Sequence, residues 1–289
     1  MSTDDRAERS PPIDNAPRSE ARKIAIGYAR GLMGGMLVGV PVMMTMEMWW
    51  EGFFVPAWRL VLLYCVNFVV LLILQHFSGL THEKTARAQA RAAVVAYGIG
   101  IVASLVVLFA LGVLHGDFQL RELAGKLLLQ SVPVSIGASV AMSEFGEAHR
   151  VAEERRAHAG YFGTLGMALA GAMLFGFGVS GTEELLTIAD QLTAFRAILL
   201  MLLSLLQVHA IVYAVDFKQR PEDAGTRKHK LEVVREGLST YALSLAVGAY
   251  LLWTFRTIGP GLGIVPTVYA VIALGFVTSL GAAAAELLI

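Results

Sequence analysis

Long stretches without a charged residue constrain this chain more than any other feature. Eight stretches with at most one charged residue hold roughly 20 mainly apolar residues each, the length that a helix needs to cross a bilayer core about 30 Å thick. With 56% apolar and only 16% charged residues, the chain is far more apolar than a soluble domain. We therefore predict an all-α fold, a polytopic transmembrane bundle with eight helices over residues 25–46, 56–76, 92–114, 124–142, 161–180, 195–215, 237–255 and 264–286.

Basic residues are unevenly distributed along the chain, although the formal net charge is zero. They gather in the N-terminal tail and around residues 84–91, 150–156 and 218–235, whereas the alternate connections carry few. Because basic loops stay in the cytoplasm, we expect both termini on the cytoplasmic side. Residues 1–23 have no apolar signal-peptide core and mix charge with proline, which predicts a disordered cytoplasmic tail.

The chain matches itself when it is shifted by 137 residues. Residues 34–65 then align without a gap on residues 171–202. The identities include a hydroxyl residue and a charged residue of each sign: Thr45 and Thr182, Glu47 and Glu184, Arg59 and Arg196. Charges of both signs in one ungapped frame are hard to obtain by chance, so we predict an internal duplication.

The duplication divides the chain into two repeats of four helices. We place the first repeat at residues 24–142 and the second at residues 161–289, with a charged cytoplasmic linker over residues 143–160. An even number of spans per repeat makes the two repeats parallel, because each enters and leaves on the same side. The linker's Glu and Arg spacing is typical of a solvated helix.

Small residues recur at every fourth position of the first span and of its counterpart in the second repeat. They are Gly27, Gly31, Gly35 and Gly39 in the first span and Thr164, Ala168, Ala172 and Gly176 in the other. Small residues at this spacing let helix backbones approach closely. Two arrangements remain open: the two spans cross at the centre of the molecule, or each packs on a neighbour within its own repeat.

The repeated Thr and Glu residues lie near the outer end of their spans. Pro41 in the first repeat, and Gly178 with Gly181 in the second, predict a kinked or broken helix there. A loosened end would bring hydroxyls, freed carbonyls and carboxylates together, and hard cations prefer such oxygen ligands. One interpretation is therefore that Thr45, Glu47, Thr182 and Glu184 form the acidic entrance of a cation pathway.

The other interpretation is an ion pair at the membrane interface in each repeat. Glu47 would then pair with Arg59, and Glu184 with Arg196, each arginine standing twelve residues further along the chain. The two interpretations are compatible, since a resting ion pair can open to admit an ion.

Polar residues also occur near the middle of two spans. Asn67 and its repeat counterpart Ser204 fall at this depth, with Gln207 and His209 close to Ser204. An uncompensated polar group is costly in hydrocarbon, so these residues either form hydrogen bonds between helices or line a hydrated path. His209 has Leu72 as its repeat counterpart, and we expect a core hydrogen bond rather than a metal or haem ligand.

Two resemblances bear on function. The "EELLTIADQLTAFR" segment is similar to the signature of glutamic intramembrane proteases, but Ile188 stands where that signature has arginine, so we expect no enzymatic activity. Together, "PVMMTMEMWWEGFF" and "GTEELLTIADQLTAFR" resemble an uncharacterised family of bacterial integral membrane proteins of about this length. That resemblance implies a bacterial inner membrane location and supplies no activity.

These observations predict a cation channel or transporter, with a non-transporting structural or regulatory membrane subunit as the alternative. The expected surroundings are the lipid bilayer and an inorganic cation, with a homo-oligomer or larger membrane complex left open. No cofactor, metal centre or nucleic-acid partner is expected, because no phosphate-binding loop, CxxC pair, HExxH helix or dinucleotide fingerprint occurs. A cavity continuous with Glu47 and Glu184 would favour transport over the alternative.

Overall fold

The computed structural model describes residues 16–78, 85–114, 119–144, 160–219 and 227–286, and all of the regular structure in them is α-helical. The first part of the chain forms α1 (Ala16–Met43), α2 (Met46–Phe54), α3 (Ala57–Ser78), α4 (Ala86–Ala110) and α5 (Leu120–Glu144). The second forms α7 (Gly160–Ser180), α8 (Glu183–Gln191), α9 (Ala194–Gln219), α10 (Arg227–Thr254) and α11 (Ile264–Glu286). Most of the predicted tail and most of the predicted linker lie outside the described residues.

The all-α prediction is confirmed, and seven described helices are long and apolar enough to cross a membrane: α1, α3, α4, α5, α7, α9 and α11. One of the eight predicted spans, at residues 237–255, is not confirmed. These residues form part of α10, which is not among the seven. Its first third is strongly charged, and polar side chains such as Tyr241, Ser244 and Tyr250 interrupt the remainder.

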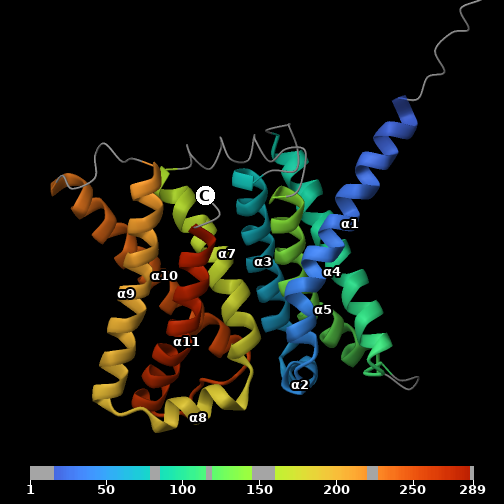
Figure 1. Ribbon diagram of the computed structural model, residues 1–289. Helices are drawn as coiled ribbons and strands as arrows, with labels where there is room; N and C mark the ends of the chain where they lie inside the picture. The colour runs from blue at the N-terminus through green and yellow to red at the C-terminus, as the bar shows by residue number, and fades with distance from the viewer. Residues whose placement is uncertain (1–15, 79–84, 115–118, 145–159, 220–226, 287–289) are drawn as a thin grey trace, which may run out of the picture.

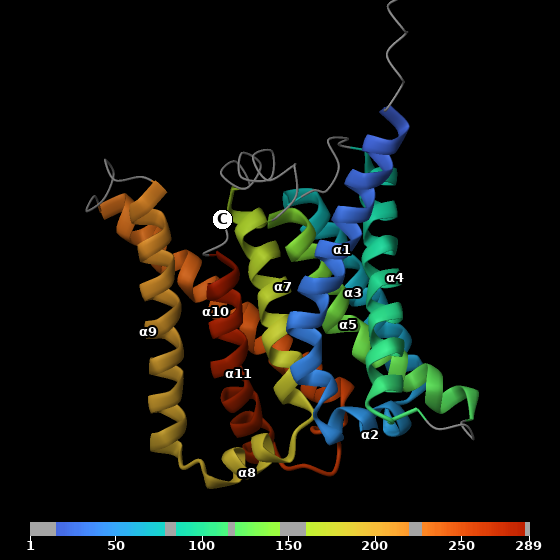
Figure 2. The same cartoon turned by 45° about the vertical axis from the view of Figure 1, so that its right-hand side comes forward.

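The long helices stand side by side, and the two short helices, α2 and α8, lie at one end of the bundle (Figure 1). A view turned by 45° shows α2 and α8 at that same end (Figure 2). We call this end the α2/α8 face. The repeated glutamates, Glu47 in α2 and Glu184 in α8, therefore lie at the same end of the bundle. The N-terminal end of α1 lies at the opposite end.

Glycine residues set the closest helix packing, which occurs between α1 and α5 and between α7 and α11. A Cβ atom on Gly34 would lie 2.0 Å from the Ala141 Cβ, and one on Gly171 would lie 2.2 Å from the Gly281 carbonyl oxygen. Each glycine-rich span therefore packs on the last helix of its own half. The structure thus selects the second of the two arrangements left open for the small residues.

Candidate functional site

The chain leaves the helical path at the same point in each half. The α1 helix ends at Met43 before α2 begins at Met46, and α7 ends at Ser180 before α8 begins at Glu183. Between them, Thr45 and Thr182 are both extended, at φ −87° and ψ 127° and at φ −92° and ψ 148°. Each hydroxyl donates to the carbonyl three residues earlier, at 2.7 Å in the first half and 3.0 Å in the second. The predicted break is therefore present in both halves, with the same hydrogen bond.

Acidic residues follow each break on the α2/α8 face. Glu47 lies in the first turn of α2 and is partly buried, whereas Glu183 and Glu184 open α8 and are exposed. Negative side chains in a first helical turn interact favourably with the helix dipole. This explains the presence of the acids without requiring an ion.

Glu51, one turn beyond Glu47, is the most deeply placed acid described at this face. Its Cγ would lie 3.5 Å from a Cβ added to Gly181, so it packs against the break between α7 and α8. Its Oε2 atom is buried and has no hydrogen-bond partner. Burial raises the pKa of Glu51 to about 7, and the positive charge of Arg256 opposes part of that rise. This carboxyl group therefore changes charge near neutral pH.

The two repeated arginines do not pair with the glutamates as predicted. Arg59 donates instead to the Trp253 carbonyl at the end of α10, and its guanidinium carbon lies 4.4 Å from the centre of the Trp253 ring. The exposed Arg196 donates to the Gln191 carbonyl at 3.1 Å. A carbonyl at a helix C-terminus carries partial negative charge, so it attracts a guanidinium. Among the described residues, no ion pair joins Glu47 to Arg59 or Glu184 to Arg196.

The mid-span polar residues are both buried, and they bond in different ways. The Asn67 amide donates to the Ser135 hydroxyl of α5 at 3.0 Å, whereas Ser204 donates to the Leu200 carbonyl of its own helix at 2.8 Å. In the second half Gln207, one turn beyond Ser204, makes the contact between helices through α11. These contacts fit the interpretation of hydrogen bonds between helices. His209 bonds within its own helix, at 2.7 Å from the Leu205 carbonyl.

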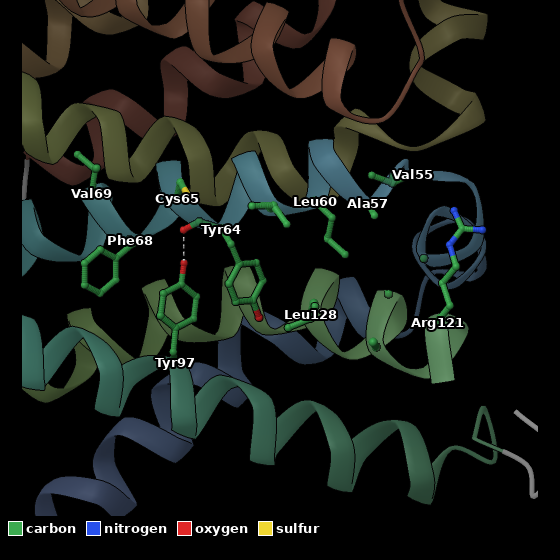
Figure 3. A pocket seen from close by; sticks show the side chains of 14 residues that line it. Val55, Ala57, Leu60, Tyr64, Cys65, Phe68, Val69, Tyr97, Arg121 and Leu128 are labelled. Atoms are coloured by element: carbon green, nitrogen blue, oxygen red, sulfur yellow. Dashed lines mark hydrogen bonds between the residues drawn. The ribbon is translucent and has the colours of Figure 1, made fainter. Parts of the chain in front are cut away.

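A cavity of about 780 Å³ lies beside α3 in the first half. Its walls come from α3, α4 and α5, with Gly52 of α2, and are mostly apolar; Arg121 lies at the end nearest α2 (Figure 3). The Tyr97 hydroxyl points to the Tyr64 carbonyl at 2.7 Å, and the Tyr64 hydroxyl bonds Ser131, so both groups are satisfied within the protein. Neither Glu47 nor Glu184 lines this cavity.

Glu51 is the residue that repeat-based reasoning passed over. Its counterpart in the second half is Ile188, so Glu51 is not one of the repeated charges. The available signal was its spacing of four from Glu47, which places both carboxylates on one side of a helix. Its burial was not readable from sequence, because Gly181 and Arg256 come from distant parts of the chain.

Comparison with known proteins gives a family without an assigned activity. No curated protein and no solved structure matches the chain. The family match extends over residues 27–289, which is nearly the whole chain and includes both breaks and all of the acids described above. The chain therefore belongs to the family described as "Putative integral membrane protein (DUF2391)".

Proposed function

We propose that the protein is a non-enzymatic cation channel or transporter of the bacterial inner membrane, with its entrance at the α2/α8 face. The observation that carries this proposal is the repeated arrangement at Thr45 and Thr182. In each half a spanning helix ends, an extended threonine follows, and a short helix then carries an acid in its first turn. Broken spanning helices form ion and substrate sites near the midplane of many transporters, and here the two breaks lie at the end of the bundle, where an entrance would be.

The proposal includes an architecture of two parallel repeats with eight spans, α10 being the eighth. Two element boundaries support it, since α8 begins 137 residues after α2 and α9 begins 137 residues after α3. Later in each half, corresponding residues are 144 positions apart. The α4 helix ends at Ala110, and α10 ends 144 residues later at Thr254. The same spacing relates Tyr97 to Tyr241.

The α2/α8 face would lie outside the cell. The described helix ends that flank the Lys- and Arg-rich connections lie at the opposite face, and basic connections are retained in the cytoplasm. On this orientation both termini are cytoplasmic. Glu47, Glu51, Glu183 and Glu184 would then meet ions arriving from outside, and carboxylates beside low-dielectric walls concentrate cations and repel anions.

The alternative is a non-transporting structural or regulatory subunit. One observation favours it: the cavity beside α3 reaches neither Glu47 nor Glu184. On this alternative the acids serve only as helix-start residues at the membrane surface, and the protein acts by binding other membrane proteins.

Ion flux into proteoliposomes separates the two functions. We expect the parent protein to pass K⁺ faster than Cl⁻, and we expect Glu47→Gln with Glu184→Gln to lower K⁺ flux about ten-fold or more, because a charged entrance raises local ion concentration by at least that factor. Asp190→Asn, which removes an exposed carboxylate at the far end of α8, is the matched control and should retain the parent flux.

Two results would decide against cation entry at these sites. Unchanged K⁺ flux in the folded double variant would remove Glu47 and Glu184 from the pathway. No flux of either ion in the parent would leave the non-transporting subunit as the function.

A further inference from the structure

The two halves of the chain contact each other through unlike faces. The main contact joins α3 of the first half to α7 of the second. In the 137-residue frame α3 corresponds to α9, and α7 corresponds to α1. A twofold arrangement would therefore also join α9 to α1, and no comparable contact joins them in the described part of the chain. The halves are joined head to tail, so one α1 face and one α9 face are left without their counterpart.

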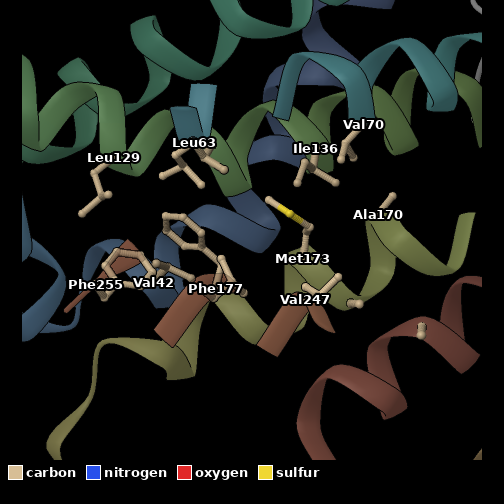
Figure 4. Close-up of a cluster of buried hydrophobic side chains, with 14 of the residues drawn as sticks. Val42, Leu63, Val70, Leu129, Ile136, Ala170, Met173, Phe177, Val247 and Phe255 are labelled. Atoms are coloured by element: carbon tan, nitrogen blue, oxygen red, sulfur yellow. The ribbon is translucent and has the colours of Figure 1, made fainter. Parts of the chain in front are cut away.

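The internal contact is closely packed on its α7 side. A Cβ atom on Gly166 would lie 2.5 Å from the Ile73 Cγ2 of α3. Ala170, Met173 and Phe177 continue this face along α7, and each is at most 3% exposed. Figure 4 shows these three side chains in the buried cluster that also contains α3 residues.

The corresponding face of α1 is exposed over its first half, whereas Met36 and Val40, the counterparts of Met173 and Phe177, are partly buried. Ala29 and Met33 stand at the positions of Gly166 and Ala170, and Met33 is 69% exposed. Over the whole span, 17% of the most apolar stretch of α1 is buried, against 56% for α7. Part of the burial of α7 comes from α3, and α1 has no comparable contact with α9 among the described helices.

The corresponding face of α9 is open in the same way. Ala210 and Ala214 occupy the positions of Ile73 and Phe77 of α3, and both are exposed, while Leu203 is 44% exposed. Small residues on this face leave room for the larger Met33 of α1, just as the larger Ile73 fits over Gly166 in the internal contact. Small residues at helix contacts allow the close approach on which association in membranes depends.

A second feature of the internal contact also recurs without its partner. Arg59 of α3 binds the Trp253 carbonyl and lies over the Trp253 ring near the end of α10. Its repeat counterpart Arg196 is exposed at the start of α9. The counterpart of Trp253 in the 144-residue frame is Phe109, 71% exposed one residue before the end of α4. An arginine and an aromatic ring thus remain available on the same two outer edges.

We propose that α1 and α4 of one copy dock on α9 of a second copy, and so repeat between chains the contact that joins the two halves within one chain. The proposal rests on the repeat architecture proposed above. Ala29 then lies against Ala210 of the second copy, and Arg196 reaches the Phe109 ring and carbonyl. A head-to-tail contact of this kind closes into a ring or extends as a chain, and a ring satisfies every α1 and α9 face.

Disulfide cross-linking in native membranes tests this contact directly. Ala29→Cys and Ala210→Cys are combined in a chain that also carries Cys65→Ser, because Cys65 is exposed. Mild oxidation should convert most of the chain into a reducible dimer, or a ladder of higher species. In the matched control Phe162→Cys replaces Ala29→Cys, since Phe162 is 83% exposed near the start of α7 and belongs to neither α1 nor α4. The control should remain monomeric.

Adding Arg196→Glu to the cross-linking pair supplies a second readout. Reversing this charge should reduce the cross-linked product several-fold while the chain remains folded, because the acid would face the carbonyl end of α4. Monomer alone from the folded Ala29 and Ala210 pair, or equal product from the Phe162 control, would overturn the assembly and leave lipid as the cover of both faces. Ion flux is measured independently of cross-linking. Cross-linking without ion flux would support the assembly and contradict only the transport function.

Discussion

Gly34→Ala and Gly171→Ala should each lower the thermal stability of the detergent-solubilised protein strongly. One added methyl group would meet the Ala141 Cβ at 2.0 Å in the first half, and the Gly281 carbonyl at 2.2 Å in the second. Both distances are far inside van der Waals contact, so α1 must move away from α5 and α7 away from α11. Overpacking of this kind costs about 1–3 kcal/mol or more.

Gly27→Ala is the matched control for both substitutions. Gly27 lies in the same helix as Gly34, and a Cβ atom there would have nothing within 4 Å. Alanine is favoured over glycine inside a helix by about 1 kcal/mol, so the control should melt at or above the parent temperature. Equal melting temperatures for Gly34→Ala, Gly171→Ala and the parent would contradict the close packing in both halves.

Glu51→Gln should stabilise the protein at pH 8 and have a much smaller effect at pH 5. The folded pKa of Glu51 is raised to about 7, above its ordinary range, so the folded protein binds this proton more tightly than the unfolded chain does. Stability is therefore lost as the pH rises toward the folded pKa, and the loss is complete above it. Partial access of water limits the gain of the variant at pH 8 to about 1–2 kcal/mol.

Arg256→Gln provides the opposing test of the same carboxyl group. The positive charge of Arg256 favours the ionised form of Glu51, so its removal should enlarge the loss of stability between pH 5 and pH 8. Melting temperatures at the two pH values measure both variants. A difference between Glu51→Gln and the parent that is the same at pH 5 and pH 8 would show that Glu51 does not titrate in this range.

Sequence patterns predicted the spanning helices well because hydrocarbon thickness fixes their length. They also located both breaks, which lie within a few residues of Pro41 and Gly181 and at Thr45 and Thr182 of one repeat frame. The α10 helix is long enough to span, but its polar side chains lower its hydropathy. It nevertheless packs beside α9 and α11.

The side-chain partners at the α2/α8 face were harder to predict, because they depend on how the halves meet. Arg59 has Glu47 nearby in sequence, yet its guanidinium bonds Trp253, 194 residues away. Glu51 owes its burial to the break at Gly181 in the other half. An internal repeat predicts features that both halves share. The contacts of Arg59 and Glu51 occur where one half meets the other, so the repeat does not predict them.

Labelling with a membrane-impermeant thiol reagent tests the central claim, that the two repeated acidic sites open on the same, outer side of the membrane. Glu47→Cys and Glu184→Cys are each introduced with Cys65→Ser, and intact spheroplasts are treated before and after lysis. Four spanning helices, α3, α4, α5 and α7, separate the two positions, so both should react fully without lysis. Reaction of either cysteine only after lysis would contradict the parallel repeats and the outer entrance together.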